Sequence, residues 1–184
     1  MPLLSDIARK RKCAYFLDPI PKNARILEIG SGGGWVGEYL RSGGWTNYIG
    51  MDLFEPADVV GDIKEWRTLG LEAGSFDVII AFEVIEHVEL VEETLDLLKP
   101  GGLLMLTSPV PHMDWAMKIF EILGLNQKRT SPHSNLVYFP SLPLYEMVEY
   151  RKVGGLSQWG ILRKDSIQSA RSAVVGMERQ SVRQ

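Results

Sequence analysis

Three glycines at alternating positions, Gly30, Gly32 and Gly34, follow directly on the apolar segment 26–29. An apolar run that stops at glycines is typical of a strand that is buried on both faces and ends in a tight turn. Glycine tolerates positive φ angles and, because it has no Cβ, lets a ligand approach the main chain. A helix beginning after Gly34 would point its free N–H groups and the positive end of its dipole at that ligand. Residues 25–40 therefore predict a strand, a turn and a helix that cradle a nucleotide-type ligand.

Length and composition limit the classes of protein to consider. A chain of 184 residues is long enough for one domain with a sizeable core, and 45% hydrophobic with 23% charged residues is typical of a soluble globular protein. The net charge of −3 argues against a nucleic-acid binder. One cysteine, Cys13, allows no internal disulfide, and without a Cys/His cluster we expect no metal and a reducing, cytoplasmic setting. No signal-peptide pattern and no apolar run of membrane-spanning length is present in the sequence.

Apolar segments separated by breakers predict alternating strands and helices. The expected elements are a helix over 3–17, strands at 48–52, 58–62, 75–81 and 103–107, and a helix over 83–98. This order predicts an α/β fold with a parallel sheet and right-handed crossovers. The basic run 9–12 in the first helix is typical of a solvent-exposed face, with a nucleic-acid or acidic-lipid contact as the alternative.

Two acids are spaced for contacts with a nucleoside. Asp52 ends the second strand about twenty residues after the glycine turn, the spacing at which a carboxylate reaches a ribose diol in dinucleotide-binding folds. Asp62 follows after only five residues and a short apolar run, too few for a helical crossover, so one usual helix is expected to be missing. Asp62 would lie near the same rim, where it could accept a hydrogen bond from an adenine amine.

The C-terminal part is expected to cover and close the sheet. A strongly apolar helix over 113–123 lies within a proline-containing region, 109–143, which we interpret as a substrate cap or a homodimer contact, with plain core packing as the alternative. Segments 144–151 and 156–163 flank Gly154-Gly155 and predict a hairpin. Residues 1–164 then form one domain, and the polar tail 165–184 is expected to be flexible.

A dehydrogenase has to be weighed against other nucleotide-binding classes. Gly32, Gly34 and Gly37 form a G-x-G-x-x-G sequence, but this motif is weak when it stands alone. Glu28 is an acid inside the first strand, which suits a cationic ligand, and the chain has no room for a separate catalytic domain. These features disfavour the nicotinamide-dependent class.

At these residues the chain resembles class I S-adenosylmethionine-dependent methyltransferases, and the similarity covers about residues 19–164. The family's first motif, an acid followed by alternating glycines, is matched by Glu28 and the glycine turn, and its second-strand acid by Asp52. Segments 76–79, 83–88 and 98–102 resemble the branch of ubiquinone-biosynthesis O-methyltransferases. The resemblance implies a Rossmann-like, mostly parallel seven-stranded sheet with an antiparallel last strand and helices on both faces.

The resemblance also implies S-adenosylmethionine as cofactor and a set of site residues. The implied cofactor contacts are Glu28, Gly30, Ser31, Gly32, Gly34, Asp52, Leu53, Asp62, Ile63, Phe82 and Glu83. His87 is the first candidate for a general base, because imidazole has a suitable pKa, and His112 and His133 are weaker candidates. The expected function is methyl transfer to a small molecule, with a sugar or lipid-linked hydroxyl as the suggested acceptor. A catalytically silent module that binds the cofactor and scaffolds a partner is the alternative.

Overall fold

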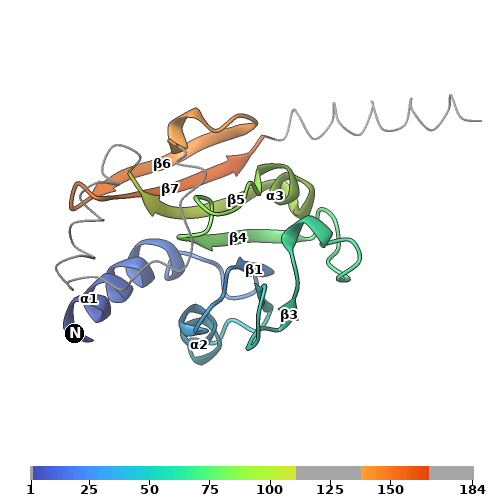
Figure 1. Ribbon diagram of the computed structural model, residues 1–184, viewed down its shortest axis with the longest axis horizontal. Coiled ribbons are helices and arrows are strands. Elements are labelled where there is room, and N and C mark those ends of the chain that lie inside the picture. Colours follow the sequence, from blue (N-terminus) through green and yellow to red (C-terminus); the bar gives the residue numbers. More distant parts are fainter. Residues whose placement is uncertain (1, 111–137, 166–184) are drawn as a thin grey trace, which may run out of the picture.

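The computed structural model describes residues 2–110 and 138–165, and the predicted cap helix 113–123 and nearly all of the tail lie outside them. Seven strands form one sheet in the order β3-β2-β1-β4-β5-β7-β6 (Figure 1). The strands are β1 (Ile26–Ile29), β2 (Tyr48–Asp52), β3 (Val59–Val60), β4 (Phe76–Phe82), β5 (Leu98–Pro109), β6 (Tyr145–Val153) and β7 (Ser157–Lys164). The α-helices of the described residues are α1 (Pro2–Lys12), α2 (Trp35–Ser42) and α3 (Val91–Leu97).

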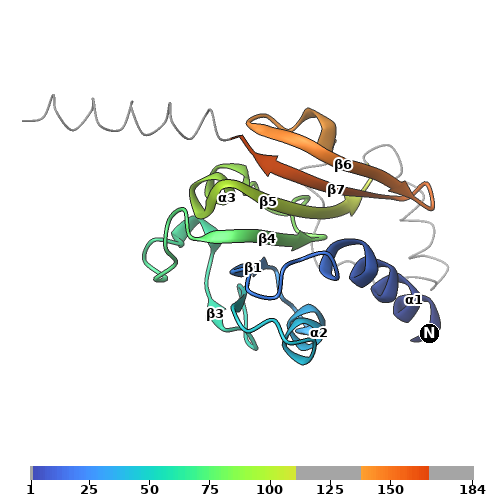
Figure 2. The ribbon, with the colours of Figure 1, turned by 180° about the vertical axis from the view of Figure 1, so that it is seen from behind.

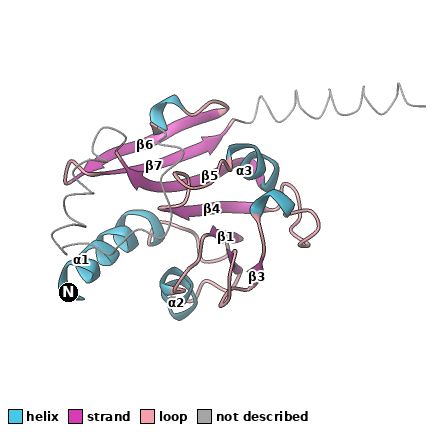
Figure 3. Ribbon diagram, in the orientation of Figure 1, coloured by secondary structure: helices cyan, strands magenta, loops and turns pink. Residues whose placement is uncertain are grey.

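The sheet has the predicted pairing directions. The pairs β1–β2, β1–β4, β2–β3 and β4–β5 are parallel, whereas β7 runs antiparallel to both β5 and β6. Figure 3 shows the strands adjoining one another with the helices outside them. The predicted Rossmann-like α/β fold with an antiparallel last strand is therefore confirmed.

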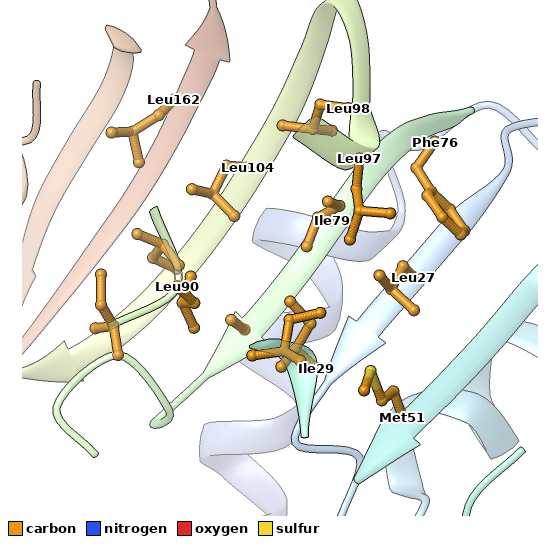
Figure 4. Packing of buried hydrophobic residues seen from close by; sticks show 14 of the residues in the cluster. Leu27, Ile29, Met51, Phe76, Ile79, Leu90, Leu97, Leu98, Leu104 and Leu162 are labelled. Atoms are coloured by element: carbon orange, nitrogen blue, oxygen red, sulfur yellow. The ribbon is translucent and has the colours of Figure 1, made fainter. Parts of the chain in front are cut away.

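Side chains alternate between two hydrophobic clusters on opposite faces of the sheet. Leu27, Ile79, Leu104 and Leu162 are paired across β1, β4, β5 and β7 and form a row on one face (Figure 4). Leu90 and Leu97 pack into the same cluster, so α3 and the loop before it cover this face. Burial on both faces explains why β1 reads as a continuous apolar run interrupted only by Glu28.

Helices α1 and α2 lie on the same side of the sheet, as Figures 1 and 2 both show. A π-helical segment, Cys13–Leu17, continues α1 and inserts the fully buried Phe16 between Phe82 and Trp159, at centroid distances of 5.0 and 5.3 Å. Val36 and Leu40 of α2 belong to this second cluster. The N-terminal segment is thus packed onto the sheet through the π-helical residues Cys13–Leu17, whereas Ile7 and Ala8 of α1 are exposed.

Three predicted boundaries need correction. The helix expected over 83–98 begins only at Val91, because Glu83 has a φ of +58° and the residues after it form an irregular loop. The strand expected over 58–62 is only Val59–Val60, joined to β2 without a helix, as the short spacing had indicated. Strand β5 begins at Leu98 rather than at 103, since Leu98 pairs with Phe76 before a register shift.

Candidate functional site

The glycine turn after β1 has the predicted conformation. Gly30, Gly32 and Gly34 have φ angles of +77°, +47° and +73°. The amides of Gly30 and Ser31 donate to the Met51 carbonyl at 2.8 and 3.0 Å, which ties the turn to the end of β2. A Cβ added at Gly30 would lie 2.4 Å from Cγ2 of Val84, so the loop after β4 rests directly against this glycine. The turn therefore needs glycine both for its backbone and for the close approach of a second segment.

Asp52 links the end of β2 to the same turn. Its Oδ2 accepts a hydrogen bond from the Gly32 amide at 2.8 Å, and its Oδ1 accepts one from the Phe54 amide at 3.2 Å. Two main-chain donors fix the carboxylate at the carboxyl edge of the sheet, where ligands of open α/β sheets bind. The spacing of about twenty residues read from the sequence thus corresponds to a direct contact.

A pocket of about 180 Å³ opens beside this carboxylate. Its lining residues are Ile29, Gly30, Met51, Asp52, Leu53, Gly61, Asp62, Ile63, Val84, His87 and Val88. Five of the implied cofactor contacts come together here: Gly30, Asp52, Leu53, Asp62 and Ile63. Five lining residues were not among the predicted site residues: Ile29, Met51, Gly61, Val84 and Val88. Val84 and Val88 lie in the segment 83–88 that resembles the family, and this position could have indicated them.

The wall and rim of the pocket differ in polarity. Asp62 accepts a hydrogen bond from the Lys64 amide at 2.9 Å and caps a 3₁₀-helix, Ile63–Glu65. Ile63 is buried, whereas Leu53 is 58% exposed at the mouth. Apolar walls with two carboxylates at the rim suit a nucleoside, which offers a flat ring and hydroxyl donors.

Glu28 lies buried in β1 and is 3% exposed. Its carboxyl accepts a hydrogen bond from the Tyr48 hydroxyl. Burial raises the pKa of Glu28 to about 7, the Tyr48 hydrogen bond acts in the opposite direction, and the charge of Asp52 raises it further. Near Glu28, the Ser31 hydroxyl is buried and has no hydrogen-bond partner among the described residues. A buried hydroxyl without such a partner, like that of Ser31, is consistent with a turn that binds a polar group of a ligand.

Phe82 and Glu83, two further implied cofactor contacts, lie on the other side of the turn. The Phe82 ring stacks on Trp35 at a centroid distance of 6.2 Å, and Glu83 forms an ion pair with Lys12 at 3.0 Å. The predicted solvent-exposed basic run is therefore right for residues 9–11 but wrong for Lys12, whose side chain is 16% exposed. No sequence pattern indicated this ion pair, because Lys12 and Glu83 are 71 positions apart.

His87, the first candidate for a general base, lines the pocket together with Asp52 and Asp62. Its amide donates to the Val84 carbonyl at 2.8 Å within the loop after β4. His87 thus lies in the pocket that suits a nucleoside. Its role as a general base stays a prediction. His112 and His133 lie outside the described residues.

Among residues 2–110 and 138–165, no three His, Cys, Asp or Glu side chains are grouped so that they could hold a metal ion. None of the helices in these ranges is long and apolar enough to span a bilayer.

Comparison with known proteins decides the family. A family model described as a methyltransferase domain matches residues 6–145. The chain belongs to the class I S-adenosylmethionine-dependent methyltransferases. The cofactor of this family is S-adenosylmethionine, and the acidic rim, apolar walls and glycine turn described above fit it.

Two curated relatives of the methyltransferase are ubiquinone biosynthesis O-methyltransferases. The one from Aromatoleum aromaticum is 27% identical over 76% of this chain and 69% of the relative. The one from Ralstonia nicotianae is 32% identical over 42% of this chain and 40% of the relative. The chain thus spans between two fifths and about two thirds of the length of these relatives.

Solved structures share the fold of the methyltransferase. A SAM-dependent methyltransferase from Methanosarcina mazei has a TM-score of 0.58 with 16% identity, covering 79% of this chain and 94% of that one. One from Mesorhizobium loti has a TM-score of 0.53 with 15% identity, covering 78% and 93%. At these identities the likeness supports the Rossmann-like architecture alone.

Proposed function

We propose that this protein transfers a methyl group from S-adenosylmethionine to a hydroxyl group of a small molecule. The observation that carries the proposal is the Asp52 carboxylate, held by the Gly32 amide at 2.8 Å on the rim of the pocket. The names of the curated relatives, which are O-methyltransferases, support oxygen as the acceptor atom.

The chain's own residues would bind and orient the cofactor. Asp52 would accept from ribose hydroxyls, Asp62 from the adenine amine, and Leu53 and Ile63 would contact the ring. When bound, the cofactor supplies an activated methyl group on a sulfonium, so the protein contributes mainly alignment and exclusion of water. The reaction therefore requires few catalytic side chains.

Methyl transfer can be measured without knowing the natural acceptor. Protein is incubated with methyl-labelled S-adenosylmethionine and a panel of phenols, sugars and polyols, and labelled products are detected by mass spectrometry. We expect turnover with a hydroxylated compound that is lost in Asp52→Ala. Absence of any turnover by folded protein that binds S-adenosylhomocysteine would favour the second candidate, a silent scaffold that holds the cofactor.

The dehydrogenase alternative has a simple test. Mixing the protein with NADH should leave the fluorescence of NADH unchanged. A saturable change in NADH fluorescence would contradict the methyltransferase proposal.

A further inference from the structure

Lys12, Glu83 and Thr107 form a polar cluster, which we call the acceptor-side cluster. Nζ of Lys12 lies 3.0 Å from Oε1 of Glu83 and 3.0 Å from Oγ1 of Thr107. The Thr107 hydroxyl also donates to Oε1 of Glu83 at 2.8 Å. Lysine is rarely withdrawn from solvent unless it is paired, and the Lys12 side chain is only 16% exposed. An ion pair with Glu83 and a hydrogen bond to Thr107 thus connect the end of α1 to the carboxyl ends of β4 and β5.

The backbone of Glu83 is strained. Glu83 follows the last residue of β4, has a φ of +58°, and donates its amide to the Thr107 carbonyl at 2.8 Å. A positive φ at a residue with a side chain costs free energy, persists only where the surroundings impose it, and occurs preferentially at functional sites. The strain therefore favours a functional role for this side chain over a surface role.

Part of the cluster's hydrogen-bonding capacity is unused. Both donors to Glu83 meet Oε1, and its Oε2 accepts no hydrogen bond from the described residues. The ammonium of Lys12 carries three donors and uses two of them within the same ranges. The Glu83 side chain remains 44% exposed. One oxygen of Glu83 and one N–H of Lys12 therefore have no hydrogen-bond partner among the described residues, and a hydroxyl group can bond to both kinds of atom.

A second carboxyl, Glu86, lies close to the cluster and is 1% exposed. Its Oε2 is buried without a hydrogen-bond partner among the described residues. Burial and the charge of Glu83 raise the pKa of Glu86 to about 7, against smaller opposite effects of a main-chain donor, Ser108 and Lys12. Two neighbouring carboxyls in such different environments are a common basis for separate acid and base roles.

The cluster borders the glycine turn on the side away from the nucleoside pocket. Nζ of Lys12 lies 5.1 Å from the centroid of Phe82, which in turn stacks on Trp35 at the start of α2. The point where strand order reverses in this sheet lies between β1 and β4, and ligands of open α/β sheets bind at its carboxyl edge. Glu83 thus lies at the ligand-binding edge, next to Val84, which packs against Gly30 of the turn.

We propose that Lys12 and Glu83 bind the hydroxyl group of the methyl acceptor, an inference that rests on the proposed function. It assigns Glu83 to the acceptor, in place of the cofactor contact that the family resemblance implied. Glu83 accepts the hydroxyl hydrogen, and Lys12 donates to the same oxygen and stabilises the negative charge that develops on it. The acceptor oxygen forms its bond to the methyl carbon while the carbon–sulfur bond breaks and leaves its electron pair on sulfur. The hydroxyl proton passes to the Glu83 carboxylate and from there to solvent.

The test measures binding separately from turnover. Two probes, catechol and methyl β-D-glucopyranoside, are titrated by calorimetry into protein saturated with S-adenosylhomocysteine, and methylation of each probe is followed by mass spectrometry. The variants are Lys12→Met, Glu83→Gln and Lys12→Arg, with Lys10→Met as a control, because Lys10 is an exposed lysine on the same helix. Melting temperatures establish that each variant is folded.

We expect at least one probe to bind and to be methylated by the wild type. Lys12→Met and Glu83→Gln should each weaken probe binding by about tenfold or more, the scale of losing a charged hydrogen-bond partner. Lys12→Arg should recover part of the loss, Lys10→Met should match the wild type, and S-adenosylhomocysteine affinity should stay within about twofold throughout.

Three results would overturn the inference, and they are distinguishable. Failure of both probes to bind protein that binds S-adenosylhomocysteine removes the hydroxyl site and leaves the cofactor assignment intact. Unchanged probe affinity in Lys12→Met and Glu83→Gln, with a lower melting temperature, shows that the ion pair is only structural. Failure of S-adenosylhomocysteine to bind folded wild-type protein removes the proposed function itself.

Discussion

The two sides of the glycine turn are built differently. On the cofactor side, the Asp52 carboxylate accepts hydrogen bonds from the main-chain amides of Gly32 and Phe54, which lie 20 and 2 positions away in the sequence. On the acceptor side, the cluster consists of side chains 71 and 95 positions apart, brought together by the packing of α1 on the sheet. A contact made by main-chain amides does not depend on the identity of nearby side chains. A cluster of side chains is altered whenever one of its residues is substituted. This difference suits a family of enzymes that share one cofactor and methylate different acceptors.

The largest effect is expected at Gly30, where the glycine turn meets the loop after β4. Gly30→Ala adds a Cβ 2.4 Å from Val84 and imposes a side chain on a φ of +77°. Backbone strain and overpacking together should lower the free energy of unfolding by about 2–4 kcal/mol, measured by urea denaturation.

Neighbouring glycines provide the matched controls. Gly32→Ala has the positive φ but open space around the added Cβ, and should cost about 1 kcal/mol. Gly33→Ala has neither feature and should stay within about 0.5 kcal/mol of the wild type. Equal losses at all three positions would contradict the close contact between the turn and the loop after β4.

The next effect concerns the affinity for the cofactor. Asp52→Ala removes the carboxylate that would hold the ribose hydroxyls, and should weaken S-adenosylhomocysteine binding by about 1–3 kcal/mol. Glu65→Ala removes an exposed carboxylate on the adjacent 3₁₀-helix and should leave the affinity unchanged. If both variants bind as the wild type does, Asp52 is not a cofactor contact.

Glu28 should make stability depend on pH. Its folded-state pKa of about 7 lies above its ordinary value of 4.5, so the folded state retains a proton that the unfolded chain releases. The stabilisation is complete below about pH 4.5 and is lost as the pH rises to about 7. Between pH 5 and pH 8 the wild type should lose about 2–3 kcal/mol of unfolding free energy more than Glu28→Gln.

The exposed Glu38 on α2 offers the control for this measurement. Glu38→Gln should follow the wild type across the same pH range. A wild-type profile parallel to that of Glu28→Gln would show that Glu28 is not protonated in the folded protein.

The smallest effect is expected at His87, which lines the nucleoside pocket. His87→Ala should raise the dissociation constant of S-adenosylhomocysteine a few-fold, about 0.5–1 kcal/mol, and change the maximal methylation rate less than Glu83→Gln does. A large loss of rate with unchanged cofactor affinity would instead identify His87 as the base and take that role from Glu83.

Much of the cofactor side could be predicted from the sequence, because its signals are local. The alternating glycines, Asp52 and the short step to Asp62 all lie within 33 consecutive residues, from Gly30 to Asp62. The parallel sheet and the closing hairpin followed from apolar runs and turn residues. Each of these features depends on spacing along the chain, which the sequence displays directly.

The acceptor side could not be predicted in the same way. Lys12 belongs to a basic run whose other members are exposed, and its contact with Glu83 depends on the packing of the following segment, Cys13–Leu17, onto the sheet. The loop after β4 was predicted as the start of a helix, whereas Glu83 has a positive φ and donates its amide to the Thr107 carbonyl of a neighbouring strand. Contacts between distant segments and strained backbone leave no local pattern.

Calorimetric titration of S-adenosylhomocysteine into the wild type, Asp52→Ala and Glu83→Gln tests the division of the site most directly. The account predicts that the wild type binds, that Asp52→Ala binds about tenfold weaker or worse, and that Glu83→Gln binds within about twofold of the wild type. No binding by the folded wild type, or an equal loss in both variants, would contradict it.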